Sequence, residues 1–386
     1  MKILFIVNVD WFFVSHRLPL AKEALKRGDE VWIITKDTGY KTLLEEIGAH
    51  VIDFPFERSG TNPFHEVLCV LGLRKLYKRI KPDVVHNITL KASLLSSLAA
   101  KLAGYKSVVN AISGFGYTFS RENVTLLQRL VVCFIKLAFK SNYFSFIFQN
   151  PDDKAMFGKL NLVGDDQIFL IKGSGVDLNV YDYTALNETE HKIKFLLPAR
   201  MLRDKGVMEF INAAMLLRDK LEGRALFILA GMCDDKNKAG ITEKELKTKL
   251  ISGYIEWIGY QKDMIPVYKN SDVVVLPSYR EGLPKSLIEA CAIGRPIITT
   301  DVPGCRECVV HDKNGLLVPA RTVQPLADAI LKLVDAKEIR VKFGQESRKM
   351  AERDFSIEKV VEKHFDIYKK INNVFVTGDN KVNNRM

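Results

Sequence analysis

Hydrophobic and polar positions alternate along the chain in two kinds of segment. Short apolar runs rich in β-branched residues, typical of buried strands, are separated by longer segments with apolar residues three and four positions apart, typical of amphipathic helices. This alternation predicts βαβ units and parallel sheets. In the first half, we expect strands at 3–7, 30–35, 49–54, 84–86, 107–111 and 145–148, and helices at 17–27, 64–80, 91–103 and 123–140.

A polar stretch at 183–192 separates this series from a second one of the same kind. Its strands are expected at 194–197, 225–230, 254–258, 273–276, 296–300 and 316–318, and its helices at 208–220 and from Lys285 onward. We therefore predict a domain over 1–180, completed by a C-terminal helix at about 355–371, a second domain over 181–354, and a polar tail over 372–386. Open parallel sheets bind ligands beyond the carboxyl ends of their strands, so two such domains facing each other would enclose a cleft.

Composition narrows the class of protein. The 386 residues are 47% hydrophobic and 27% charged, which is typical of globular and not of disordered chains. The net charge of +11 suits an anionic partner such as nucleic acid, phosphorylated metabolites or an acidic membrane surface. Six cysteines are too few for a disulfide scaffold and indicate a reducing compartment. Cys305 and Cys308 lack the second ligand pair of a structural zinc site, so we predict no metal centre.

No window reaches the roughly 20 apolar residues that cross a bilayer. One segment is nevertheless a candidate for membrane contact. Residues 126–140 are strongly apolar, with Arg129, Lys136 and Lys140 interspersed. This pattern fits an interfacial helix, and it also fits a core helix of the first domain.

The most informative chemistry follows the strand at 273–276. There the chain runs through Glu281 and Gly282 into a helix that begins near Lys285. A helix start offers backbone N–H groups and the positive end of the helix dipole, which suits a phosphate. Glu281 and Glu289 could accept hydrogen bonds from the hydroxyls of a sugar and a ribose; the alternative is that both are solvated surface residues.

A second group follows the strand at 194–197. Arg200 and Lys205 come directly after it, and two cations beyond a strand end could neutralise a diphosphate leaving group. Basic loop residues are usually solvated, so Arg200 and Lys205 indicate a diphosphate site only in combination with Glu281 and Glu289.

Arg200 with Lys205 and Gly206, and Glu281 followed eight residues later by Glu289, resemble the signature of the retaining family-4 glycosyltransferases of GT-B fold. The resemblance covers nearly the whole chain. It implies an α/β protein of two Rossmann-like domains facing a central cleft, with a nucleotide-sugar donor held mainly by the second domain. It also implies that no metal and no cofactor are required.

The resemblance implies roles for particular residues of the second domain. It puts Arg200 and Lys205 on the donor diphosphate, Glu281 on the sugar hydroxyls and Glu289 on the nucleotide ribose. The phosphate cradle would be completed by the turn of Gly282, Leu283, Pro284 and Lys285.

The first domain departs from the commoner family pattern. Many members carry a histidine where this chain has residues 112–117, so the resemblance carries no histidine-assisted role over to this chain. Members that extend polyprenyl-diphosphate-linked glycans with N-acetylhexosamines or related sugars are more similar. Gly114 and Gly116 could bring backbone amides to the donor, or form a simple tight turn. His16, Arg17 and Lys91 could receive an acceptor phosphate, or be ordinary surface or capping residues.

The expected activity is retaining transfer of a sugar, taken to be an N-acetylhexosamine, from a UDP-sugar to a lipid-linked or glycan acceptor. Same-face attack is favoured because no residue can be nominated as a carboxylate nucleophile. We expect a cytoplasmic protein on the inner face of a bacterial cell membrane, acting in surface glycan assembly. No nucleic-acid motif is present. Two alternatives stay open: a nucleotide-sugar hydrolase or epimerase of GT-B fold, and a non-catalytic nucleotide-sugar or anion-binding protein.

Overall fold

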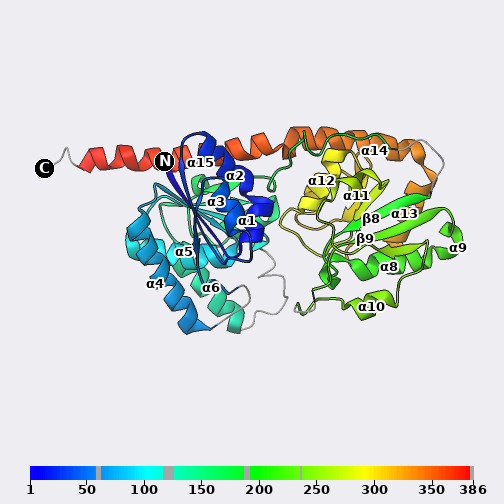
Figure 1. Ribbon diagram of the computed structural model, residues 1–386, viewed down its shortest axis with the longest axis horizontal. Coiled ribbons are helices and arrows are strands. Elements are labelled where there is room, and N and C mark those ends of the chain that lie inside the picture. The colour runs from blue at the N-terminus through cyan, green and yellow to red at the C-terminus, as the bar shows by residue number, and fades with distance from the viewer. Residues whose placement is uncertain (58–61, 116–125, 187–191, 235–236, 383–386) are drawn as a thin grey trace. The chain divides into compact units, whose positions relative to one another are not determined.

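The computed structural model describes residues 1–57, 62–115, 126–186, 192–234 and 237–382, with side chains throughout except at 126–131 and 373–382. The chain divides into two compact units. The first unit comprises residues 1–174 and 358–386, and the second unit comprises residues 175–357. The C-terminal helix therefore belongs with the N-terminal part of the chain (Figure 1).

The first unit is built on a seven-stranded parallel sheet in the order β3-β2-β1-β4-β5-β6-β7. Its strands are β1 Lys2–Val7, β2 Glu30–Thr35, β3 His50–Asp53, β4 Val84–Ile88, β5 Val108–Ile112, β6 Phe144–Phe148 and β7 Ile168–Leu170. Its helices are α1 Asp10–His16, α2 Leu18–Lys26, α3 Lys41–Glu46, α4 Pro63–Ile80, α5 Leu90–Ala103, α6 Leu126–Phe139, α7 Pro151–Gly158 and α15 Ile357–Val382, with a short 3₁₀ turn at Asp165–Gln167.

Alternation along the strands assigns each face of this sheet to different helices. Leu4 and Ile6 of β1 lie in the core that α4, α5 and α6 cover. Phe5, between them, points the other way, and its ring lies 5.3 Å from Phe13 of α1 and 5.5 Å from His86 of β4. The hydroxyl of Tyr368 on α15 reaches the same histidine. Helices thus cover both faces, as a parallel sheet requires (Figure 1).

The second unit has a six-stranded parallel sheet in the order β10-β9-β8-β11-β12-β13. Its strands are β8 Ile193–Pro198, β9 Ala225–Ala230, β10 Ile255–Trp257, β11 Val273–Leu276, β12 Ile297–Thr300 and β13 Gly315–Val318. Its helices are α8 Val207–Leu216, α9 Arg218–Leu221, α10 Glu243–Lys247, α11 Ile265–Lys269, α12 Lys285–Ile293, α13 Gln324–Asp335 and α14 Lys337–Met350, with short turns at Arg203–Lys205, Arg306–Cys308 and Ala351–Phe355.

Local chemistry explains where several helices begin and end. Asn62 caps α4 by accepting a hydrogen bond from the amide of Phe64, and Pro63 fills the first position of that helix. Asn150 and Pro151 start α7 in the same way. Gly104 and Gly294 end α5 and α12 in the left-handed conformation that glycine adopts readily.

Most expected elements are confirmed to within two residues, and two expectations are wrong in detail. The helix expected at 208–220 is divided into α8, which ends at Leu216, and α9, which begins at Arg218. The helix expected at 17–27 is confirmed as α2, and α1 precedes it as a separate helix because the chain breaks at Arg17 ahead of Pro19. Helix α15 continues to Val382 and so runs through most of the segment expected as a polar tail. Strand β7 and helices α3, α7, α10 and α14 lie in segments for which no element was expected.

Candidate functional site

The second sheet reverses its strand order at β8. From β8 the chain moves outward to β9 and β10, and then returns to place β11 on the other side of β8. The loops that follow β8 and β11 therefore leave the sheet beside each other at a topological switch point, where open parallel sheets bind ligands. Lys205 lies on the loop after β8, and Glu281 lies on the loop after β11.

The two loops meet through an ion pair. The ammonium group of Lys205 donates to Oε1 of Glu281, and the hydroxyl of Ser278 lies 2.8 Å from the same oxygen. Burial by itself lowers the pKa of Lys205, but the charge of Glu281 and its hydrogen bond outweigh burial and raise it. Lys205 is therefore held as a cation in a largely buried position, with the Glu281 carboxylate accepting its hydrogen bond.

Two glycines make this close approach of loops possible. Gly206 has φ +72°, and a Cβ atom there would lie 2.1 Å from the carbonyl oxygen of Pro277. Gly304, after β12, has φ +83°, and its Cβ would lie 2.4 Å from the carbonyl oxygen of Glu281. The loops after β8, β11 and β12 are thus pressed together by backbone contacts that only glycine permits.

Arg200 lies on the same loop as Lys205 but has another partner. Its Nη1 lies 2.9 Å from Oδ2 of Asp234, which follows β9. The Arg200 side chain is about one third exposed, so it can be reached from solvent. The sequence pattern singled out both cations, and the structure shows that each is held by a carboxylate from a neighbouring strand end.

Glu289 lies on α12, one turn into the helix. Its two carboxylate oxygens lie 3.0 Å from the hydroxyl of Tyr181 and 3.1 Å from that of Tyr268, and the ammonium group of Lys285 lies 3.5 Å away. Burial, and then the charge of Glu289, raise the pKa of both tyrosines, so both phenols stay protonated donors. Sequence reasoning missed Tyr181 and Tyr268, because neither lies near Glu289 along the chain.

The turn from Gly282 to Lys285 leads β11 into α12. Leu283 is buried in the core beneath the turn, and Pro284 is the N-cap residue with extended dihedral angles. Hydrogen bonding within the helix begins with the amide of Leu287, which donates to the carbonyl of Pro284. The start of α12 therefore has the geometry that favours an anion, beside Glu281 on the same loop.

The acceptor candidates of the first unit each have partners within that unit. His16 stacks on Phe12, with ring centroids 4.1 Å apart. Lys91, at the start of α5 after β4, lies 2.6 Å from a carboxylate oxygen of Glu66 on α4 and donates to the carbonyl of Glu57. Arg17 is only 4% exposed. This burial excludes the alternative that Arg17 is an ordinary surface residue, and its assignment to an acceptor phosphate stays a prediction.

Arg17 belongs to a buried group with His86, His364 and Tyr368. The Tyr368 hydroxyl contacts Nδ1 of His86, and the two histidine rings stack with centroids 5.5 Å apart. Burial lowers the pKa of Arg17 to about 10 and that of His364 to about 3, and it lowers the pKa of His86 strongly. Both histidines are therefore neutral beside a buried guanidinium, and the group holds α15 on the sheet.

The remaining glycine candidates differ in what can be said of them. Gly114 has φ +71°, with nothing within 4 Å of the position that a Cβ would take, so the turn needs the left-handed conformation but leaves space beside it. Gly116 lies outside the described residues.

One group among the described residues has the composition of a metal site. Ligand atoms of His65, Glu66 and Cys69 lie within 4.8 Å of one another on α4. Glu66 already pairs with Lys91, and burial raises the pKa of the Cys69 thiol. A cation at this place would therefore have to compete with an ammonium group and deprotonate a buried thiol.

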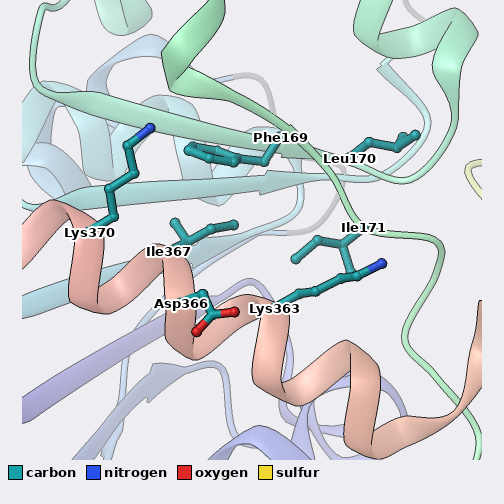
Figure 2. Close-up of a pocket in the computed structure, with 7 residues that line it drawn as sticks. All are labelled: Phe169, Leu170, Ile171, Lys363, Asp366, Ile367 and Lys370. Carbon is teal, nitrogen blue, oxygen red and sulfur yellow. The ribbon is translucent and has the colours of Figure 1, made fainter.

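A shallow cavity of about 230 Å³ lies between β7 and α15 in the first unit (Figure 2). Its lining includes Phe169 and Ile367, and Lys370 reaches across it to lie 5.0 Å from the Phe169 ring centre. None of the sequence-predicted site residues lines this cavity, so it is a packing hollow beside α15. Among the described helices, none has both the length and the apolar character needed to span a bilayer.

Comparisons with known proteins agree with this architecture. Residues 2–150 match the family described as glycosyl transferase 4-like, and residues 184–350 match glycosyl transferases group 1. An N,N'-diacetylbacillosaminyl-diphospho-undecaprenol alpha-1,3-N-acetylgalactosaminyltransferase of Campylobacter jejuni is 29% identical over 359 residues, covering 89% of this chain and 92% of that protein. A UDP-Gal:alpha-D-GlcNAc-diphosphoundecaprenol alpha-1,3-galactosyltransferase of Escherichia coli is 25% identical over 354 residues, covering 88% of each chain.

A solved structure shows the same fold over almost the whole length. The Anabaena protein HepE, crystallised with UDP and glucose, superposes with a TM-score of 0.75 at 18% identity, covering 95% of this chain and 98% of that one. With both halves matched, the chain is a glycosyltransferase of GT-B fold, whose first domain belongs to the glycosyl transferase 4-like family and whose second belongs to glycosyl transferases group 1.

Proposed function

We propose that this glycosyltransferase moves a sugar from a UDP-sugar to a polyprenyl-diphosphate-linked glycan, with retention at the anomeric carbon, during assembly of a bacterial surface polysaccharide. The observation that carries the proposal is the Lys205–Glu281 pair at the switch point, beside the start of α12. The names of the Campylobacter and Escherichia relatives support an undecaprenyl-diphosphate-linked acceptor. The complex of HepE with UDP and glucose supports a UDP-sugar donor.

In this proposal the donor diphosphate binds between the two cations and the start of α12. Arg200 would exchange Asp234 for a phosphate oxygen, which its partial exposure permits. Lys205 would stay paired with Glu281 while adding a phosphate contact, because an ammonium group has three donors. Fixed cations of this kind stabilise the charge that develops on the departing nucleotide. The same residues take the place that a divalent ion holds in other transferases, so transfer is expected to survive chelation.

Glu281 is proposed to orient the sugar. Its carboxylate can accept bonds from Lys205 and Ser278 and still accept one from a sugar hydroxyl, since two oxygens offer about four lone-pair positions. Glu289 is proposed to accept a hydrogen bond from a ribose hydroxyl, using a carboxylate lone pair that Tyr181 and Tyr268 do not occupy. The sugar is taken to be an N-acetylhexosamine, as in the name of the Campylobacter relative.

The place of action follows from the acceptor. A polyprenyl chain stays in the bilayer, so we propose that the protein works in the cytoplasm on the inner face of the cell membrane. The excess of positive charge supports this placement, because anionic lipids attract basic surfaces.

The first experiment is a thermal-shift screen against UDP-, GDP-, ADP- and dTDP-sugars without added metal, since a ligand that binds only the folded state raises the unfolding temperature. We expect a shift with UDP-sugars. A shift with another nucleotide alone would overturn the choice of donor.

The second experiment measures UDP release with EDTA present, with and without a short-chain diphosphate-linked glycan, and determines the anomeric configuration of the product. We expect release to depend on acceptor and the product to retain configuration. Equal release without acceptor would indicate a hydrolase, and an inverted product would overturn retention.

A further inference from the structure

Helix α4 exposes an unusual set of apolar side chains to solvent. Phe64 is 83% exposed, Leu68 66%, Val67 58% and Leu71 50%. Their spacing of three, four and seven positions places them on one face of the helix. We call these four residues the α4 surface.

The opposite face of the helix is already used for packing. Cys69, Leu73, Tyr77 and Ile80 are buried in the core of the first unit. A helix of this kind ordinarily presents polar residues to solvent on its other face. An apolar row on both faces therefore indicates that the outer row has a partner of its own.

Charge identifies the kind of partner. Along the same face, the row continues into the exposed residues Lys75, Lys78 and Arg79. Helices α4, α5 and α6, which pack side by side through α5, carry eight basic residues and one acidic residue. The acidic residue is Glu66, which pairs with Lys91. The partner is thus apolar where it meets the α4 surface and anionic beside it.

Helix α6 carries a second set of the same character. Phe134 and Leu137 are exposed there, with Lys136 between them, while Ile135, Ala138 and Phe139 face the core. The two readings of segment 126–140 are therefore not exclusive, because the described part of α6 has a core face and an outer apolar face.

We propose that the α4 surface inserts into the headgroup region of an anionic lipid bilayer, with Lys75, Lys78 and Arg79 on the lipid phosphates and α6 contributing a neighbouring contact. Interfacial helices bind in this way, by burying apolar side chains at the acyl boundary while basic residues meet anionic lipids. A second copy of the chain fits less well, because pairing these faces brings like charges together. The proposal rests on the proposed function, in which the acceptor lies in the membrane.

Vesicle binding tests the α4 surface directly. The purified full chain is floated with vesicles of phosphatidylcholine alone, and with vesicles containing about one third phosphatidylglycerol. We expect binding to the anionic vesicles, and we expect Leu68→Ser/Leu71→Ser to weaken it at least about tenfold. Both residues are exposed, so the variant should fold. We expect Lys75→Gln/Lys78→Gln to weaken binding at low salt and to reduce its salt dependence.

The matched control is Met215→Ser/Leu216→Ser, which removes two apolar side chains of similar exposure from α8 in the second unit. This control should bind vesicles as the unmodified chain does. Equal loss in both double variants, no vesicle binding by the unmodified chain, or a dimer in solution that Leu68→Ser/Leu71→Ser abolishes would each overturn the proposal.

An activity readout separates this proposal from the proposed function. With a short-chain, water-soluble acceptor, Leu68→Ser/Leu71→Ser should transfer sugar at the unmodified rate. With a long-chain acceptor in vesicles, its rate should fall with vesicle binding. If Leu68→Ser/Leu71→Ser keeps the unmodified rate on both acceptors, the membrane proposal is overturned and the transferase assignment stands. If the unmodified chain transfers sugar to neither acceptor, the proposed acceptor is overturned, and vesicle binding still tests the α4 surface.

Discussion

The two units balance their charges in different ways. The second unit carries 28 lysine and arginine residues against 26 aspartate and glutamate residues, and its site cations are held by carboxylates from adjacent strand ends. The first unit carries 29 basic residues against 20 acidic ones, so it holds most of the chain's excess of positive charge. The difference supports the two proposals, a compact ligand bound at paired charges by the second unit and an extended anionic surface met by the first.

The units also differ in how they bury polar groups. In the second unit the Lys205 ammonium group and the Glu281 carboxylate are paired with each other and held by close loops, although Oδ1 of the neighbouring Asp204 is buried without a hydrogen-bond partner. Around Arg17 the buried nitrogens Nε of Arg17 and Nε2 of His86 and His364 have no hydrogen-bond partner. Unpaired buried nitrogens cost stability, so the first unit should be the more sensitive to small changes there.

The largest effect is expected at the ion pair of the second unit. Lys205→Ala removes the cation proposed to stabilise the departing diphosphate, and Glu281→Ala removes the carboxylate proposed to orient the sugar. Each should lower the turnover number at least about 100-fold. Initial rates at saturating donor measure the change. Arg203→Ala, in the same short turn but exposed and paired with Glu245, is the control and should keep its rate. Near-normal rates in folded Lys205 and Glu281 variants would remove the assigned site.

The next effect tests whether close loops are needed. Gly206→Ala puts a methyl group against the carbonyl of Pro277 and should lower both the unfolding temperature and the turnover number. The free energy of unfolding should fall by more than the roughly 1–2 kcal/mol that a left-handed backbone alone costs. Gly223→Ala has a similar φ of +86° with nothing within 4 Å, so it reports that backbone cost by itself. If both variants lose the same stability, the left-handed backbone explains the need for glycine at position 206, and the contact between the loops does not.

A smaller effect is expected in the first unit. Tyr368→Phe removes the hydroxyl that contacts Nδ1 of His86 and should lower the free energy of unfolding by about 1–3 kcal/mol. Chemical denaturation measures the change, and Tyr40→Phe, at a more exposed tyrosine of the same unit, serves as control. The donor-induced thermal shift should persist, since the proposed donor site lies in the second unit. Loss of that shift would mean that the two units do not act separately.

The effect that is smallest at neutral pH, and grows only in acid, concerns protonation. Burial, and then the charge of Arg17, lower the pKa of His364 from 6.5 to about 3 in the folded protein. Between these values the unfolded chain binds a proton that the folded chain does not, so stability is complete above about pH 6.5 and falls as the pH drops toward 3, by up to about 1.4 kcal/mol per unit. His364→Gln should flatten this dependence, and His50→Gln, at an exposed histidine, should not. Parallel curves for His364→Gln and the unmodified chain would contradict the assignment.

The sequence predicted the strands well because buried parallel strands are short apolar runs bounded by turns. It predicted that Lys205 and Glu281 have related roles, since both follow strands. It did not predict that Arg200 pairs with Asp234 or that two tyrosines hold Glu289, because those partners come from other strands and loops. It gave no sign that Arg17 is buried, because the neighbouring group includes Tyr368 of α15, more than 300 residues later in the chain.

The sequence by itself determined the two α/β halves, the excess of positive charge and the residue types at the donor site, because periodicity, composition and motif spacing are local properties. Only the tertiary structure decided which strand ends become neighbours, which cations are paired or buried, and which apolar side chains of α4 stay exposed. Those outcomes depend on strand order and on the packing of distant helices, and neither can be inferred from any one segment of the chain.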